Sequence, residues 1–136
     1  MFRLSIVTPE KIVFDGEVAS LIVPGVEGYL GVLSHHAPLI TALQTGKIEF
    51  RDAGDKLHIF AVSGGFIEVS HNTATLLADT AEHSDEIDVQ RAQTTFDRLT
   101  KGLDDGEVLA GGVGAFEQKD ALRRASNRLK IFKETH

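Results

Sequence analysis

The chain changes its hydrophobic period near residue 84. Before that point, apolar residues recur at every second position in short β-branched runs, and after it they recur every three or four residues. Period two is typical of strands and a period of 3.6 is typical of helices. We therefore predict a β-domain over residues 1–84 and a helix-loop-helix domain over residues 85–136.

The first part contains many short strand signals bounded by turn residues. We expect about nine or ten strands from the spacing of these runs, which favours an antiparallel β-sandwich over a βαβ fold. The fold class is thus α+β, with the sandwich followed by an antiparallel helical hairpin. Three dipeptides mark turns, Asp15-Gly16, Pro24-Gly25 and His71-Asn72, and residues 63–65 (Ser-Gly-Gly) are interpreted as a tight turn or bulge between strands. The clearest strand signals lie at residues 2–8, 12–14, 18–23, 29–33, 39–43, 46–51, 57–62, 66–69 and 73–78.

Two narrow apolar stripes predict the helices. Ser84 or Asp85 is expected to cap the first one, because acidic residues follow where a helix N-terminus favours them. A Gly-rich loop over residues 102–114 separates the two helices. Stripes of this width suit two helices packed on each other. The stripe residues are Ala92, Phe96, Leu99 and Leu103 in the first helix and Leu122, Ala125, Leu129 and Phe132 in the second.

Composition narrows the function classes. The absence of cysteine excludes disulfides and thiolate metal sites. No apolar run approaches the roughly 18 residues of a transmembrane helix, and the alternating N-terminus lacks a signal core, so we expect a cytoplasmic protein. The net charge of −6 argues against nonspecific nucleic-acid binding. Residues 116–136 carry a net charge of +3, which suits an acidic protein partner, a phosphate ligand or a solvated helix face.

Motifs of enzyme chemistry are missing from the sequence. There is no Gly-x-Ser-x-Gly elbow, no Walker A loop and no dinucleotide fingerprint. His35 and His36 are adjacent, and neighbouring residues of an extended strand point to opposite faces, so we predict no metal ligand there. We accordingly expect no catalytic residue, no metal and no obligatory cofactor.

A group of charged residues stands out in the helical part. Asp88 and Arg91 are three residues apart, Arg98 follows seven residues after Arg91, and Arg124 and Arg128 are four apart. If the helices form a hairpin, these arginines converge into a cluster that suits the phosphates of a polyanion. The alternative is that Asp88 and Arg91 form an ordinary ion pair in the first turn of a helix.

Several blocks of sequence resemble the epsilon subunit of bacterial F-type ATP synthase. They are residues 23–33 (Val-Pro-Gly-Val-Glu-Gly-Tyr-Leu-Gly-Val-Leu), 36–39 (His-Ala-Pro-Leu), 62–69 (Val-Ser-Gly-Gly-Phe-Ile-Glu-Val), 77–82 (Leu-Ala-Asp-Thr-Ala-Glu) and 87–92 (Ile-Asp-Val-Gln-Arg-Ala). The last block is similar to the family's ATP-binding pattern. One departure is the Gly-rich loop, since the family usually joins its helices by a shorter connection.

The resemblance implies a non-catalytic rotor subunit that couples the gamma subunit to the c-ring, on the cytoplasmic face of the bacterial membrane. It also implies that the helical hairpin inhibits ATP hydrolysis at the catalytic beta subunits and takes ATP as a regulatory ligand. The ATP contacts implied are Glu82, Ile87, Asp88, Arg91, Ala92, Arg98, Arg124 and Arg128. The candidate partner contacts are Gly31, His35 and His36 toward the ring, and Arg123, Lys130 and Lys133 toward the beta subunits.

Two other functions are compatible with the same sequence. One is a β-sandwich binding module with a helical interaction tail and no link to a synthase. The other is a hydrolase with a metal site at His35 and His36.

Overall fold

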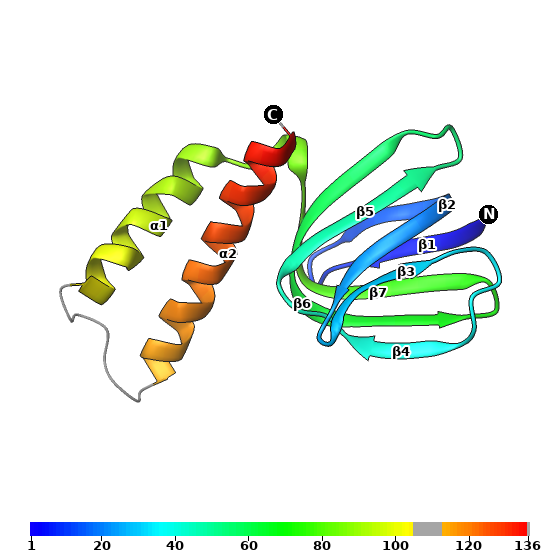
Figure 1. The fold of residues 1–136 in the computed structure, drawn as a ribbon, viewed down its shortest axis with the longest axis horizontal. Coiled ribbons are helices and arrows are strands. Elements are labelled where there is room, and N and C mark those ends of the chain that lie inside the picture. The colour runs from blue at the N-terminus through cyan, green and yellow to red at the C-terminus, as the bar shows by residue number, and fades with distance from the viewer. Residues whose placement is uncertain (105–112, 136) are drawn as a thin grey trace. The chain divides into compact units, whose positions relative to one another are not determined.

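The computed structural model describes residues 1–104 and 113–135, and the side chains of residues 1–101 and 119–135. The chain divides into two compact units, Met1–Ser84 and Asp85–His136 (Figure 1). The first contains seven strands: β1 (Phe2–Val7), β2 (Ile12–Gly25), β3 (Gly28–Val32), β4 (Leu39–Ala42), β5 (Gly46–Asp52), β6 (Leu57–Ser70) and β7 (Thr73–His83). The second contains the helices α1 (Val89–Asp104) and α2 (Val113–Thr135).

The strands form a mixed sheet. Their order is β1-β7-β6-β5-β2-β3, with β4 paired to β6, and β1 also pairs with β2, which folds the sheet into a sandwich. Every pair is antiparallel except β1 with β7, which is parallel. The prediction of a wholly antiparallel sandwich is therefore wrong at this pair. Strands joined by a short hairpin must run antiparallel, whereas β1 and β7 are separated by the rest of the domain and are under no such constraint.

Two of the predicted strand breaks do not exist, which reduces the number of strands to seven. Asp15-Gly16 lies inside β2, where Ser5 of β1 pairs with Asp15. Residues 63–65 lie inside β6 and pair along β7, although Gly64 and Gly65 have φ angles of 65° and 110°. In both places, pairing with a neighbouring strand overrides the local preference for a turn. The break expected at Pro24-Gly25 is confirmed, since β2 ends at Gly25 and β3 begins at Gly28. The predicted His71-Asn72 turn is confirmed as a two-residue hairpin that pairs Ser70 with Thr73.

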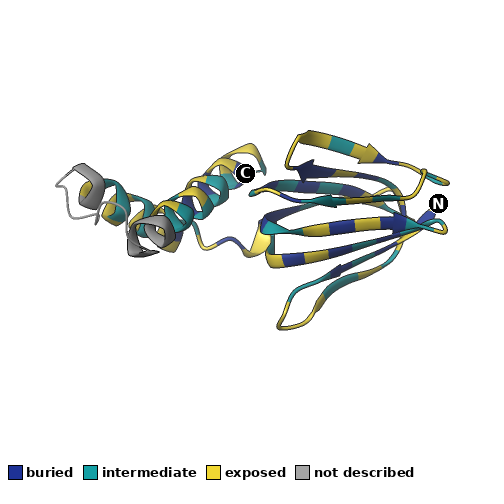
Figure 2. Cartoon of the chain, turned by 90° about the horizontal axis from the view of Figure 1, so that it is seen from below, coloured by how far each residue is buried: buried dark blue, intermediate teal, exposed yellow. Residues whose placement is uncertain are grey.

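The sandwich core is built by the predicted alternation. Buried and exposed residues follow one another along the strands (Figure 2), as with Phe2, Leu4 and Ile6 of β1. The same period places Ile67 and Val69 of β6 inside. A continuous cluster of buried side chains from all the longer strands fills the space between the two layers.

The two helices of the second unit lie side by side and antiparallel (Figure 1). Ala92, Ala125 and Leu129 of the predicted stripes are buried, and Phe96, Leu99, Leu122 and Phe132 are half-buried. Ile131 is also buried, at 1% exposure, although it lies outside the predicted stripe. The buried surface of α2 is thus wider than the pattern suggests. The side chain of Leu103 and most of the predicted Gly-rich loop fall outside the described residues.

The start of α1 differs from the prediction. Ser84–Glu86 form a short 3-10 turn, and α1 begins only at Val89, so neither Ser84 nor Asp85 is its cap. No helix in the described part of the chain is long and apolar enough to cross a membrane.

Candidate functional site

The start of α1 is organised by Asp88. Its Oδ1 atom accepts the backbone N–H of Arg91 at 3.0 Å, and its carbonyl oxygen accepts the N–H of Ala92 at 3.0 Å. Asp88 is therefore the N-cap residue, which satisfies one of the backbone donors that a helix start leaves without an intrahelical partner. Ile87 and Ala92 are buried, whereas Asp88 and Arg91 are exposed. The predicted motif thus places one carboxylate and one guanidinium on the surface above an apolar pair.

The guanidinium of Arg91 does not pair with Asp88. The bond between the two residues runs from the backbone of Arg91, and among the described side chains Arg91 has no ion pair. The ordinary first-turn ion pair that the sequence left open is therefore not formed. This leaves the Arg91 side chain available at a helix N-terminus, where the helix dipole favours an anion.

The remaining candidate arginines lie on both helices. Arg98 is exposed on α1, two turns after Arg91, and Arg124 and Arg128 are half-buried on α2. Antiparallel packing places the start of α1 beside the later half of α2, which carries Arg124 and Arg128 (Figure 1). Arg124 is held by Asp120 of the same helix through an ion pair and hydrogen bond. An incoming phosphate would compete with that carboxylate for Arg124.

Glu82 belongs to the first unit, whereas the other candidate ATP contacts belong to the second. It is half-buried on β7, the last strand of the first unit.

The exposed side of α2 carries a basic stripe, defined by Lys119, Arg123, Lys130 and Lys133. These residues are all exposed, and their spacings of four, seven and three place them along one side of the helix. Three of them were predicted as partner contacts, whereas Lys119 was not. The (i, i+4) spacing of Lys119 and Arg123 is the signal that points to it.

The predicted ring-facing residues lie at β3 and the connection after it. Gly31 is exposed on β3. His35 and His36 lie in a turn and not on a strand, since the N–H of His36 reaches the carbonyl oxygen of Leu33 at 3.2 Å and His35 has a φ angle of 62°. The argument that adjacent strand residues diverge therefore does not apply to them. No group of three or more metal-ligating side chains occurs within the described residues.

An exposed apolar patch, defined by Ile40, Phe66 and Leu77, was not predicted. Phe66 of β6 pairs with Leu77 of β7 and with Ala42 of β4. Ile40 of β4 pairs with the exposed Glu68, two residues after Phe66 on the same strand face. Ile40, Phe66 and Leu77 are 72%, 58% and 55% exposed. Their signal is present in the sequence: Phe66 is out of phase with the buried Ile67 and Val69, so it must face outward.

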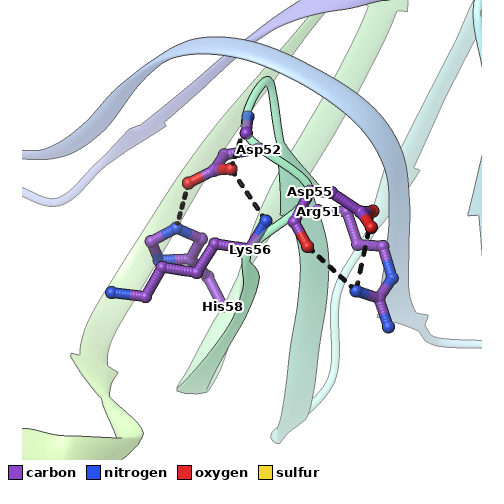
Figure 3. Close-up of polar contacts among 6 residues, drawn as sticks. Arg51, Asp52, Asp55, Lys56 and His58 are labelled. Atoms are coloured by element: carbon purple, nitrogen blue, oxygen red, sulfur yellow. Dashed lines mark hydrogen bonds and ion pairs between the residues drawn. The ribbon is translucent and has the colours of Figure 1, made fainter.

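A polar cluster closes the β5–β6 hairpin (Figure 3). The Asp52 carboxylate accepts Nε2–H of His58 at 2.8 Å and the backbone N–H groups of Gly54 and Lys56 at 2.9 and 3.0 Å. The His58 ring stacks on Phe50 with centroids 4.8 Å apart. The hydrogen bond from His58, followed by the one from the Lys56 N–H, lowers the pKa of Asp52. These contacts fix the hairpin.

Comparison with known families identifies a match over the first unit. The beta-sandwich domain of the ATP synthase delta/epsilon chain matches residues 1–84. Among curated proteins, the ATP synthase epsilon chain of Moorella thermoacetica is 46% identical over 128 residues, covering 94% of this chain and 93% of that one. The epsilon chain of Desulforamulus reducens is 43% identical over 128 residues, covering 94% of each chain.

Solved structures agree on the fold. A chain in the mitochondrial ATP synthase of Euglena gracilis, solved as OSCP, F1 and c-ring, superposes with a TM-score of 0.77 at 20% identity. The alignment covers 98% of this chain and 80% of that one. A chain in the central stalk and c-ring structure from Tetrahymena thermophila gives a TM-score of 0.58 at 16% identity, covering 98% and 94%.

Proposed function

Since the chain belongs to the ATP synthase epsilon-chain family, a non-catalytic subunit of the rotary complex, we propose that it couples the gamma subunit to the c-ring and restrains ATP hydrolysis. The observation that carries the proposal is identity above 40% with epsilon chains over nearly the whole of both sequences. The solved relatives from Euglena and Tetrahymena are titled as assemblies that contain the c-ring, which fits a place in the rotor.

The apolar patch of Ile40, Phe66 and Leu77 is our candidate surface for the gamma subunit. It spans three neighbouring strands and is interrupted by one carboxylate, that of Glu68, so it offers a largely apolar face that a folded partner would cover. Large exposed apolar patches commonly mark protein interfaces. We assign the patch to gamma because a subunit that transmits torque must bind the stalk stably. Burial of apolar surface provides such stable binding.

The turn carrying His35 and His36, together with Gly31 on β3, is our candidate for contact with the c-ring. This surface combines the two imidazoles with the exposed side chain of Leu33, and such a mixed surface suits contact with loops that leave the membrane. The subunit is then peripheral, on the cytoplasmic face of the bacterial membrane.

The helical unit is our candidate for the inhibitory element. When it extends along gamma, the basic stripe of α2 reaches acidic segments of the catalytic beta subunits and stops rotation. In the compact hairpin, ATP is the regulatory ligand, held by Arg91 at the helix start with Arg98, Arg124 and Arg128 contributing. Ile87 and Ala92 support that surface from below, and Asp88 orders the first turn. Glu82 remains a candidate contact from the end of β7.

The coupling role is tested with two exchanges in the assembled synthase. Phe66→Glu is expected to weaken binding to gamma by about tenfold or more, because burial of such a side chain is worth about 1.5–3 kcal/mol. His36→Glu is expected to leave gamma binding intact and to lower the number of protons pumped per ATP. Glu17→Gln, a change at an exposed position of β2, which carries no residue of the patch, is the control. Normal gamma binding by Phe66→Glu would remove the patch from the interface, and normal pumping by His36→Glu would remove the ring contact.

A further inference from the structure

We infer that Asn72 is the positioning residue of the ring-facing end of the sandwich. It ties the chain start and the His35–His36 turn to the β6–β7 hairpin and so presents them as one surface. The inference rests on the proposed function, because it concerns the surface assigned there to the c-ring.

Three hydrogen bonds converge on Asn72. Its Oδ1 atom accepts the backbone N–H of His35 at 2.8 Å, and its Nδ2 group donates to the carbonyl oxygen of Met1 at 3.0 Å. Its own carbonyl oxygen accepts the N–H of Arg3 at 3.2 Å. One residue therefore holds two segments that lie 37 and 71 positions away in the chain. In Figure 1 the chain start, the β3–β4 connection and the β6–β7 turn lie at the same end of the sandwich.

The backbone at this point requires a special residue. His71 and Asn72 have φ angles of 50° and 58°, the left-handed conformation of a two-residue hairpin, and asparagine is among the few residues that adopt it readily. Glycine adopts it as well. The turn itself can therefore be kept by glycine, whereas the two side-chain bonds require asparagine.

The bond to His35 determines how the histidines are presented. His35 also has a positive φ angle of 62°, a conformation uncommon for a residue with a side chain, and its N–H is the group that Asn72 holds. Fixing this peptide fixes the directions in which the His35 and His36 side chains leave the backbone. His36 is further held through Nδ1, which lies 2.7 Å from the carbonyl oxygen of Ala37.

The two turns that Asn72 joins carry three imidazoles and no carboxylate, together with the exposed side chain of Leu33. His71 lies in the same turn as Asn72 and is exposed, so it joins His35 and His36 at this end. Residues 33–38 and 70–73 include no Asp or Glu, in a chain whose net charge is −6. Such a surface suits a polar loop that offers hydrogen-bond acceptors, such as side-chain carboxylates, amide oxygens or backbone carbonyls.

The test compares Asn72→Gly with Asn72→Asp in the assembled synthase. Glycine keeps the turn and removes both side-chain bonds, so we expect proton pumping per ATP to fall while gamma binding and thermal stability stay close to those of the parent. Aspartate keeps the Oδ1 acceptor for His35, so it is expected to retain most of the pumping. Asp55→Gly is the matched control, because Asp55 has a φ angle of 64° in a different hairpin turn.

The outcomes distinguish a failure of the role of Asn72 from a failure of the proposed contact with the c-ring. If Asn72→Gly pumps as well as Asp55→Gly while His36→Glu uncouples, the ring contact stands and the role of Asn72 is overturned. If His36→Glu and Gly31→Glu both pump normally, the ring contact itself is wrong. Should Asn72→Gly fail to fold, Asn72→Asp decides: uncoupling in a folded Asn72→Asp protein would contradict the proposed bond to His35.

Discussion

Asp88 and Arg91, three residues apart, have different roles at the start of α1. The sequence suggested that they bind ATP together or bind each other. In the structure the carboxylate of Asp88 is used to cap α1, and the guanidinium of Arg91 is not engaged by it. Asp88 is therefore assigned to the order of the first turn, and Arg91 stays our candidate for a direct phosphate contact.

We predict that Arg91→Ala weakens ATP binding to the isolated chain by at least about tenfold, since a hydrogen bond to a charged group contributes about 1.5–3 kcal/mol. Calorimetry measures the loss directly. Arg123→Ala, an exposed arginine of the basic stripe, is the control and should bind ATP as the parent does. Equal affinity of the parent and Arg91→Ala would remove Arg91 from the ATP site.

The Asp52–His58 pair predicts a pH dependence of stability. Because the folded-state pKa of Asp52 is lowered, its contribution is present above the unfolded-state value of about 3.9 and is lost as the pH falls through the folded-state value. Asp52→Asn keeps an oxygen for the turn N–H groups and loses the charge that faces His58. We expect it to melt below the parent at pH 7, with the difference narrowing in thermal scans below pH 4. A difference that stays constant with pH would show that the charge of Asp52 contributes nothing.

Some features of single residues can be predicted from their neighbours in the sequence, and others cannot. The exposed basic residues of α2 follow from spacing, whereas the role of the motif at the start of α1 was implied by the family resemblance. The role of Asn72 does not follow from spacing, because its partners His35 and Met1 are distant in the chain and meet it only after the sandwich has closed. The cap of α1 was misplaced for a related reason: several acidic residues precede the helix, and only the 3-10 turn decides which one is used.

Strands and helices were predicted well wherever the hydrophobic period is regular. The alternation in β1 and the stripes of the helices give the fold class and the order of the two parts. The errors lie at glycines inside long strands, where turn preference and strand pairing conflict. The parallel pairing of β1 with β7 cannot be predicted from local sequence patterns either, because it joins the first strand of the domain to its last.

Gly65 shows what keeps β6 continuous. It has a φ angle of 110°, and a Cβ atom there would collide with the carbonyl oxygen of Leu77 on β7. We predict that Gly65→Ala lowers the free energy of unfolding by at least about 2 kcal/mol, since backbone strain alone costs about 1–3 kcal/mol. Denaturant unfolding measures the change. Gly31→Ala is the control, because its Cβ would meet nothing closer than 4.0 Å, and equal losses in the two variants would contradict this explanation.

Taken as a whole, the chain joins a unit with an extensive core to a smaller helical unit. The sandwich has a continuous buried cluster drawn from β-strands, whereas the hairpin buries small and aliphatic residues such as Ala92, Ala125 and Leu129. In the function that we propose, this helical pair is the part of the chain that exists in two states. To move such a pair from 1:99 to 99:1, a ligand needs a difference in affinity of about 5.5 kcal/mol between the states. Several arginine–phosphate contacts at 1.5–3 kcal/mol each are of that order.

The two-unit organisation leads to a prediction about the whole synthase. Deleting residues 86–136 removes both helices and leaves the sandwich with its patch, Gly31, His35 and His36. We expect the truncated chain to assemble and to support proton pumping close to the parent level, because every proposed contact with gamma and the c-ring lies in the part that remains. ATP hydrolysis is expected to rise and to lose its dependence on the ATP concentration, because the basic stripe and the candidate ATP site are both absent. Hydrolysis rates of membranes carrying the parent or the truncated chain, measured at low and high ATP, distinguish the outcomes. Unchanged hydrolysis would mean that the helices do not act as a brake in this protein, and failed assembly would mean that they also hold the rotor together.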